Sequence, residues 1–306
     1  WLNIFMKNHD KKTFHLAGIV PVAGKELDFG FEWSDCMIPI ASNYTAVERA
    51  VVECAWAGCE TIWIICNDDV SPLVQHRIGD FIYDPVWMNR TFDRFPSESR
   101  KIIPIFYVPI HPNDRDKRDS LGWSVLHGAL TAFKIAAKMS RWLIPSRYYV
   151  AFPYGIYNPE ILRQHRKNIS SNKPFYLSHN GKSIRDGEYL GFTFDKDDFV
   201  KFRRVVRQGT GFWDPSSDRR EGRYPTKSLP IEKRFSARHF TLDKIFNCVI
   251  LDSVEVISLP WYFNIGCWDR YCNYMGSQEQ KQVIKPKHLL KARKLNLIGE
   301  NINDNI

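Results

Sequence analysis

The sequence predicts an α/β protein built around a doubly wound, mixed sheet. Through the first half of the chain, short apolar runs of strand length alternate with stretches in which apolar residues recur every three or four positions. The first unit is a strand at 14–22, a helix at 43–58 and a strand at 61–66. A strand–helix–strand unit of this length joins parallel strands. Because the pattern repeats, we expect helices on both faces of one sheet.

Local signals support each element of this unit. The first strand is predominantly apolar and ends at Ala23 and Gly24, as a buried strand that runs into a loop does. Asn43 or Thr45 is suited to cap the helix, and Gly58 is suited to end it. One helical face is apolar and consists of Ala46, Val47, Ala50, Val51, Cys54 and Ala55.

The same signals predict the remaining elements. Further helices are expected at 71–83, 125–140, 197–207, 267–275 and 286–294, and another begins at 158–160. Further strands are expected at 101–108, 148–152, 174–178, 188–194 and 248–259. In doubly wound sheets, ligands bind beyond the carboxyl ends of the strands. We therefore expect a site in the loops that follow Val22, Cys66, Val108 and Phe152.

Length and composition bound the class of protein. The chain has 306 residues, of which 44% are hydrophobic, enough for one substantial core. It contains no continuous apolar run of about 18 residues, the length that a membrane span requires. The residues around Met6 are typical of a translation start and lack a secretory leader, so we expect a cytoplasmic protein. The seven cysteines form no CxxC pair and are typical of reduced core thiols, although a metal site with Cys267, Cys272 and a distant histidine stays open.

The net charge of +9 favours polyanionic partners such as nucleotides or phosphosugars. Modest basic clusters occur at 201–207 and 219–223, but the charge is otherwise dispersed. Without a nucleic-acid motif beside it, dispersed charge favours solvated surfaces over a nucleic-acid groove.

Four segments carry a family resemblance. They are Ala-Gly-Ile-Val-Pro-Val-Ala-Gly at 17–24, Met-Ile-Pro-Ile at 37–40 with the helix and strand that follow, Ser-Leu-Gly-Trp-Ser at 120–124, and Trp-Tyr-Phe-Asn-Ile-Gly-Cys-Trp-Asp-Arg-Tyr at 261–271. In their order and spacing they resemble the sugar nucleotidylyltransferases, which form nucleotide sugars from a nucleoside triphosphate and a sugar 1-phosphate. The resemblance implies a Rossmann-like, GT-A-like fold. It also implies a nucleotide-binding half at 6–170, a sugar-binding half at 171–275 and a polar C-terminal tail at 276–306.

The resemblance also implies where the nucleotide would bind. Ala23 and Gly24 stand at the start of the family's phosphate loop, and Lys25 could meet a phosphate. Gly122 and Trp123 stand in the segment that reads the nucleobase. Magnesium would be the cofactor of an active enzyme, because phosphoryl transfer depends on positioning and on neutralising phosphate charge.

The residues that the family's chemistry needs are largely replaced. Two magnesium carboxylates are implied at positions that carry Tyr154 and Asn264. The family's Gly-Thr-Arg run is replaced here by a segment that contains Glu26 and Asp28, which would repel a phosphate. A family lysine falls at 35–36, where the sequence has Asp-Cys. These departures predict weak or lost catalysis.

Other acids offer alternatives. Asp68 and Asp69 follow a strand and could hold a metal at the ligand edge of the sheet. Asp114 and Asp116 form a DxD, the metal-binding pattern of glycosyltransferases, but they lie in a run of alternating charges that favours a solvated loop.

Three hypotheses stay open. The chain could be an active nucleotidylyltransferase with a shifted metal site. It could be a non-catalytic protein that binds a nucleotide or nucleotide sugar, or serves as an assembly subunit or homo-oligomer. Least favoured is a glycosyltransferase. The replaced residues favour the second.

Overall fold

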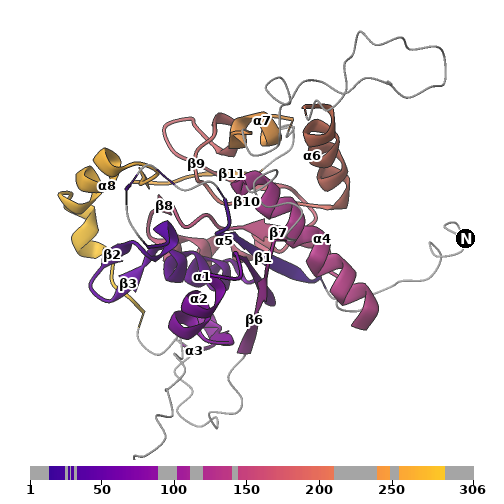
Figure 1. Ribbon diagram of the computed structural model, residues 1–306, viewed down its shortest axis with the longest axis horizontal. Helices are drawn as coiled ribbons and strands as arrows, with labels where there is room; N and C mark the ends of the chain where they lie inside the picture. Colours follow the sequence, from indigo (N-terminus) through magenta and orange to yellow (C-terminus); the bar gives the residue numbers. More distant parts are fainter. Residues whose placement is uncertain are drawn as a thin grey trace, which may run out of the picture.

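The computed structural model describes residues 14–24, 27, 29–30, 33–88, 102–110, 120–139, 144–209, 240–248 and 255–286. In these residues, eight strands form one sheet in the order β11-β9-β10-β7-β1-β4-β6-β5 (Figure 1). Their bounds are β1 Leu16–Pro21, β4 Thr61–Ile65, β5 Phe81–Tyr83, β6 Ile102–Val108, β7 Arg147–Val150, β9 Phe175–Ser178, β10 Phe192–Phe194 and β11 Glu255–Ser258. The predicted α/β fold with a doubly wound, mixed sheet is confirmed.

Strand direction places most carboxyl ends at one edge of this sheet. β1 runs parallel to β4 and β7, β4 to β6, and β9 to β11. β10 is antiparallel to both β7 and β9, and β5 is antiparallel to β6. All eight strands except β5 and β10 therefore end at the same edge, where a doubly wound sheet binds its ligands.

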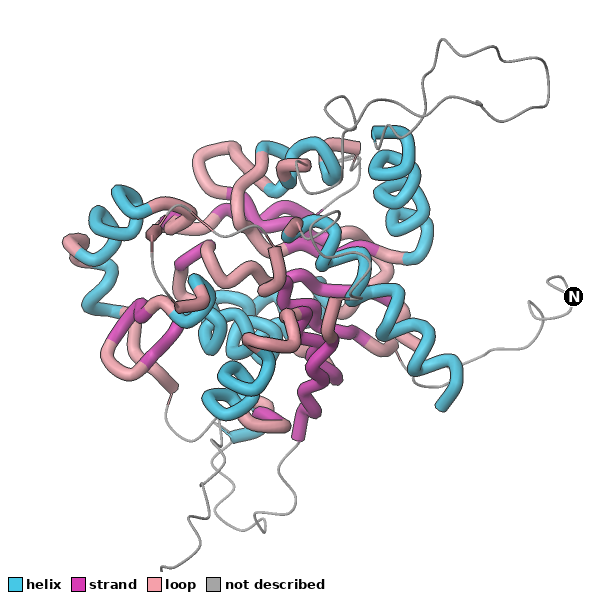
Figure 2. Tube along the Cα trace, in the orientation of Figure 1, coloured by secondary structure: helices cyan, strands magenta, loops and turns pink. Residues whose placement is uncertain are grey.

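Helices cover both faces of the sheet, as Figure 2 shows. One core contains the apolar side chains of α1 (Ala46–Ala57) and α5 (Leu162–Ile169). The other contains those of α4 (Leu121–Met139), α6 (Lys196–Gly209) and α7 (Leu242–Phe246). The shorter elements are α2 Ser71–Ile78, α3 Pro85–Met88, α8 Trp268–Met275, and 3-10 helices at Asp35–Met37, Pro159–Ile161, Ile184–Asp186 and Glu279–Gln282.

The first helix forms for the local reasons that its sequence predicts. Thr45 caps α1 in a capping box with Glu48, and Gly58 ends it with φ 92°. Asn43, the other candidate cap, instead has φ 54°. It lies between β2 (Pro39–Ala41) and β3 (Tyr44–Thr45), which pair as a small hairpin. Gly18 lets the helix approach β1 closely, because a Cβ there would lie 2.8 Å from Cys54 Sγ.

Several predicted elements differ from the structure. Of the strand expected at 248–259, Cys248 lies in a turn, residues 249–254 lie outside the described residues, and β11 covers Glu255–Ser258. The helix expected at 71–83 ends after Ile78, because Gly79 has φ 88°, and residues 81–83 instead form the edge strand β5. The strand expected at 188–194 is wrong for its first four residues, since only Phe192–Phe194 are in β10. The segment before β10 is a loop, and this loop matters for the site.

The end of the described chain packs against the β2–β3 hairpin. The hydroxyls of Tyr271 and Tyr274 donate to the carbonyls of Pro39 and Ile40 over 2.8 and 2.9 Å. Lys285 Nζ lies 2.7 Å from a carboxylate oxygen of Glu48. Most of the helix expected at 286–294 lies outside the described residues, and the proposed boundaries at 170 and 276 stay predictions.

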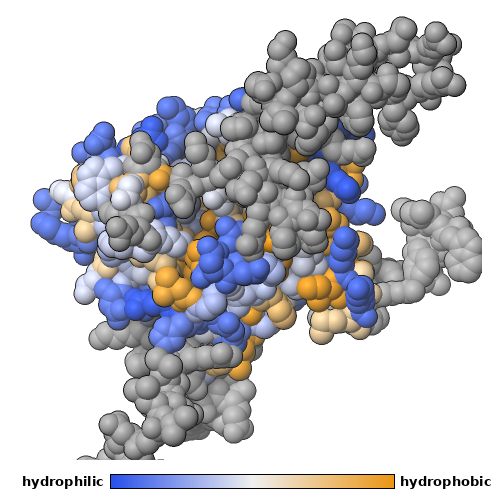
Figure 3. Space-filling view, viewed as in Figure 1, coloured by the Kyte–Doolittle hydropathy of each residue, from blue (hydrophilic) through white to orange (hydrophobic). Residues whose placement is uncertain are grey.

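The described residues contain no helix that is both long and apolar enough to cross a bilayer. On the face that Figure 3 draws, hydrophilic residues are spread widely, with smaller apolar groups between them. This distribution agrees with the charged residues being dispersed along the sequence.

Candidate functional site

The structure brings the backbone segments that contain Tyr154 and Asn264 together at the carboxyl edge of the sheet. A short segment after β7 contains β8 (Gly155–Ile156), and one after β11 contains β12 (Phe263–Asn264). β8 and β12 form an antiparallel pair in which Asn264 stands opposite Gly155. The amide of Ile265 donates to the carbonyl of Tyr154 over 2.9 Å. We call this pair the β8–β12 ladder.

Tyr154 is buried and packs edge to face against Tyr189, with ring centroids 5.7 Å apart. Burial raises the pKa of the Tyr154 phenol well above its usual value, and the nearby Cys36 and Asp35 raise it further. The phenol is therefore neutral at physiological pH. A neutral, buried phenol is a poor substitute for a magnesium carboxylate.

Asn264 is held by hydrogen bonds on both sides of its amide. Its Nδ2 donates to Glu188 Oε2 over 2.8 Å, and its Oδ1 accepts from the amide of Gly266 over 2.9 Å. The hydroxyl of Tyr262 donates to the same oxygen of Glu188 over 3.1 Å. We call Glu188, Tyr262 and Asn264 the Glu188 cluster. The cluster places the carboxylate of Glu188 next to Asn264, the position at which the resemblance implies a magnesium carboxylate.

Sequence reasoning missed Glu188, because the residue was assigned to a strand. The loop before β10 carries it across to β12, and the amide of Tyr189 donates to the Tyr262 hydroxyl over 2.9 Å. Close packing makes this approach possible, since a Cβ on Gly155 would lie 1.9 Å from the carbonyl oxygen of Tyr189. No local pattern marks such a contact.

These residues do not fit the magnesium site that the resemblance implies. Magnesium needs oxygen ligands in near-octahedral geometry, usually with one or two carboxylates. Tyr154 is neutral, and the oxygen of Asn264 is bonded to the amide of Gly266. Over the described parts of the chain, no three His, Cys, Asp or Glu residues gather in a way that could hold a metal ion.

Asp68 and Asp69 lie apart from this cluster. Both are exposed in the connection between β4 and α2, and Asp69 Oδ1 accepts a hydrogen bond from the amide of Val70 over 3.1 Å. Because β1 lies between β4 and β7, two strand spacings, together about 10 Å, separate the ends of these strands.

The end of β1 is tied to the start of α4. The amide of Ala23 donates to the carbonyl of Ile65 over 2.8 Å, and its own carbonyl accepts from the Ser124 hydroxyl. A Cβ on Gly24 would lie 3.1 Å from the backbone nitrogen of Leu121. The structure thus brings Ala23 and Gly24 to the first turn of α4, which also contains Trp123.

Gly122 permits a close contact with α7. A Cβ at this position would lie 2.4 Å from Cδ1 of Ile245, so the helices meet over this glycine. The amide of Trp123 donates to the hydroxyl of Ser120 over 3.2 Å at the start of the helix. The proposed phosphate ligand Lys25 lies outside the described residues, as do Glu26, Asp28, Asp114 and Asp116.

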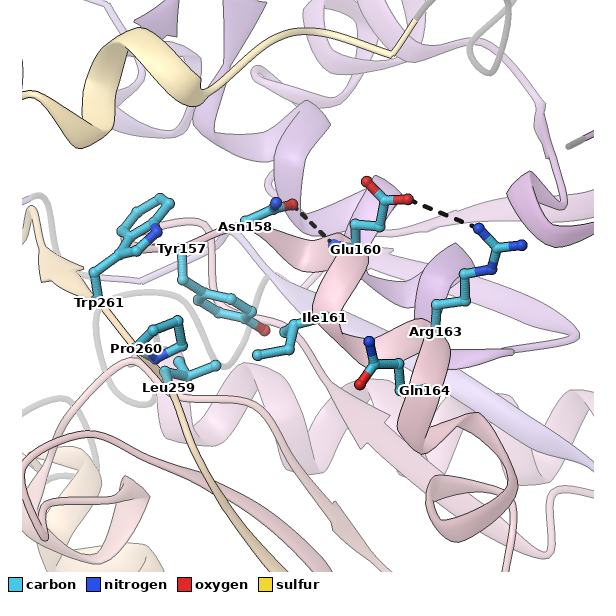
Figure 4. A pocket seen from close by; sticks show the side chains of 9 residues that line it. All are labelled: Tyr157, Asn158, Glu160, Ile161, Arg163, Gln164, Leu259, Pro260 and Trp261. Atoms are coloured by element: carbon cyan, nitrogen blue, oxygen red, sulfur yellow. Dashed lines mark hydrogen bonds and ion pairs between the residues drawn. The ribbon is translucent and has the colours of Figure 1, made fainter.

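A pocket of about 660 Å³ lies beside the β8–β12 ladder (Figure 4). Its nine lining residues come from the segment that runs from β8 into α5 and from the connection after β11, and are Tyr157, Asn158, Glu160, Ile161, Arg163, Gln164, Leu259, Pro260 and Trp261. The polar residues gather where α5 begins, and Asn158 Oδ1 caps this turn by accepting from the amide of Glu160 over 3.0 Å. Sequence reasoning placed a helix start here but no pocket.

The β8–β12 ladder separates this pocket from the Glu188 cluster. Tyr262 and Asn264 both reach Glu188 and so share one face of their extended segment. Trp261 contacts Phe263, with ring centroids 6.2 Å apart, on the alternate positions. Alternate residues of an extended chain point to opposite faces, so the ladder is a wall common to both surfaces.

No family model and no curated protein sequence matches the chain. A protein from Bacillus anthracis assigned as a glucose-1-phosphate thymidylyltransferase, solved in complex with sucrose, aligns with 90% of this chain and 98% of its own at 9% identity and a TM-score of 0.52. The fold is nucleotidyltransferase-like. The protein Rv0371c from Mycobacterium tuberculosis aligns with 86% of this chain and 99% of its own, at 11% identity and a TM-score of 0.43. At 9% identity the likeness to the Bacillus anthracis structure is one of fold.

Proposed function

We propose that this chain uses its nucleotidyltransferase-like fold to bind a nucleotide sugar, with metal-dependent nucleotidyl transfer weak or lost. One observation carries the proposal. The two adjacent positions to which the resemblance assigns magnesium carboxylates hold a neutral, buried Tyr154 and an Asn264 whose amide is bonded on both sides. Charge on a transferring phosphate would lack the cation that normally neutralises it.

The same region keeps chemistry suited to a sugar. Glu188 accepts hydrogen bonds, as sugar hydroxyls require, and its orientation is set by Tyr262 and Asn264. Tyr189, next to this cluster, adds aromatic surface, which packs against the CH groups of a sugar ring. The thymidylyltransferase assignment of the Bacillus anthracis neighbour, and its complex with sucrose, agree with a carbohydrate as part of the ligand. A role as an assembly subunit on the same fold is the alternative.

A thermal-shift panel tests the proposal. The full chain is heated with UDP-glucose, dTDP-glucose, GDP-mannose or glucose 1-phosphate, each with magnesium chloride and with EDTA. A ligand at about 100 times its Kd adds about 2.7 kcal/mol of stability, which raises Tm by several degrees. We expect a nucleotide sugar to raise Tm equally in both conditions. A rise that requires magnesium would support an active enzyme instead, and no rise with any compound would favour the assembly role.

Restoring the carboxylates tests the explanation for lost catalysis. We expect the Tyr154→Asp, Asn264→Asp double variant to show a magnesium-dependent rise in Tm that the parent lacks, because it restores both carboxylates that the resemblance implies. Tyr154→Asn is the uncharged control for the loss of the ring. Circular dichroism establishes that both variants fold. If magnesium changes the Tm of the folded double variant and of the parent by the same amount, the two positions do not form a metal site.

A further inference from the structure

A fully buried ion pair contacts the chain segment that contains β8. Arg49 and Glu53 stand one turn apart on α1, with Nη2 and Oε2 separated by 2.8 Å and side-chain exposures of 0% and 1%. The hydroxyl of Tyr149 donates to the other oxygen of Glu53 over 2.8 Å. Burying two charges is costly, and apolar residues of similar size often give equal or greater stability. Stability alone is therefore a weak explanation for this pair.

Arg49 contacts the chain on both sides of β8. Before the strand, Nη2 donates to the carbonyl oxygen of Phe152 over 2.7 Å. After the strand, the guanidinium lies over the ring of Tyr157, 5.1 Å from its centroid. β8 is only two residues long and pairs with β12 outside the main sheet. A single side chain thus connects the segment around this short strand to a helix of the core.

The position of β8 matters to both surfaces of the candidate site. Tyr154 precedes β8, and Tyr157, which follows it, lines the pocket. Asn264 is held opposite Gly155 by the ladder. A shift of β8 would therefore move the wall between the pocket and the Glu188 cluster.

We propose that Arg49, fixed by Glu53, is a positioning residue that holds β8 in place and thereby sets the affinity of the site for its ligand. The effect on affinity rests on the proposed nucleotide-sugar binding, whereas the effect on β8 does not. The planar guanidinium can bond to a carboxylate, donate to a carbonyl and stack on a ring at once, which a lysine ammonium cannot do.

The test replaces the pair with apolar residues and measures β8 directly. In the Arg49→Met, Glu53→Leu variant we expect a Tm that is lower than that of the parent by a few degrees at most. Apolar packing offsets the loss of the ion pair, whereas the Tyr149 hydroxyl and the Phe152 carbonyl lose their partners. Amide hydrogen exchange in peptides covering 152–158 and 262–266 is expected to become about tenfold faster or more, with exchange in β1 and β4 unchanged. The Kd for UDP-glucose, or for whichever compound of the panel the parent binds, is expected to rise about tenfold or more.

Arg147→Met is the matched control, because Arg147 is also a buried arginine in an ion pair, 3.2 Å from Asp195, but stands at the opposite end of β7. We expect it to lower Tm without changing exchange in the β8–β12 ladder or the Kd. Arg49→Lys keeps the charge and should give the faster exchange without leaving Glu53 unpaired.

The outcomes separate the two proposals. Unchanged exchange in the ladder of the folded double variant overturns the positioning role, whatever the parent binds. Faster exchange with an unchanged Kd overturns the link to affinity. If the parent binds no compound of the panel, the proposed function fails, while faster exchange would still establish that Arg49 holds β8.

Discussion

Two acidic groups at the carboxyl edge of the sheet differ in what holds them. Asp68 and Asp69 lie in the loop that follows β4, where both are exposed, and Asp69 accepts a hydrogen bond from the next residue. Glu188 follows no strand of the site, yet it accepts from Tyr262 and Asn264, which are 74 and 76 residues further along the chain. Sequence position alone brings Asp68 and Asp69 to the edge of the sheet. Glu188 is in addition oriented by hydrogen bonds from residues that are distant in the sequence.

A side chain at Gly155, where the backbone of Tyr189 approaches closely, should have the largest effect on stability. Gly155→Ala would place a Cβ 1.9 Å from the carbonyl oxygen of Tyr189, and neither backbone can yield cheaply. We expect a loss of about 3 kcal/mol or more in the free energy of unfolding by urea. Gly276→Ala is the control, because its Cβ would lie 3.6 Å from the nearest atom and should change stability by less than about 0.5 kcal/mol. Equal stability of the two variants would contradict the close approach.

Removing the carboxylate of Glu188 should have the next largest effect. Glu188→Ala leaves the Tyr262 hydroxyl and the Asn264 amide without their acceptor, which costs about 1–3 kcal/mol for buried groups and is expected at the lower end for this half-buried cluster. Glu188→Gln keeps an acceptor oxygen and should lose less. Urea unfolding measures the change in stability, and the Kd for the bound nucleotide sugar measures the change in affinity. An unchanged Kd in Glu188→Ala would mean that the Glu188 cluster is not part of the binding site.

Alkaline pH should weaken the region around Tyr154 and the Glu188 cluster. Burial raises the pKa of Tyr154 and of Tyr262 above the usual value, and Glu188 raises that of Tyr262 further. The folded state thus keeps protons that the unfolded chain releases near pH of about 10. Stability from these phenols is present below that pH and is lost as the pH rises above it.

Absorbance of tyrosinate at alkaline pH checks this prediction. The ionisation of the buried phenols should coincide with unfolding measured by circular dichroism. Tyr154→Phe, which removes one of these phenols, should reduce the loss of stability per pH unit. A smaller loss of stability per pH unit in the parent than in Tyr154→Phe would contradict this prediction.

Changes at Asp68 and Asp69 should have the smallest effect. Each alanine variant is expected to alter the free energy of unfolding by less than about 0.5 kcal/mol, because the side chains are exposed. The Kd for a nucleotide sugar should match that of the parent, with or without magnesium. A magnesium-dependent loss of affinity in Asp68→Ala would restore these acids as metal ligands and reverse the comparison.

Sequence patterns predicted most of the fold because the signals are local. The apolar stripe, the cap at Thr45 and the stop at Gly58 placed α1 to within a few residues. The run at 71–83 was misread because helix and strand are both compatible with a short apolar segment, and the positive φ of Gly79 decided between them. Tyr154 and Asn264 were found in sequence only because the resemblance pointed to them.

By itself, the sequence determined the layered α/β fold and the parallel strands, and the resemblance in it led us to propose that two carboxylates are replaced. Tertiary structure alone decided that Glu188 would stand beside Asn264, that Trp261 would line a pocket, and that Arg49 would contact both sides of β8. The physical reason is the separation in sequence between the residues that interact. Periodicity and caps act between residues a few positions apart, whereas these contacts join side chains that only the closed sheet brings together.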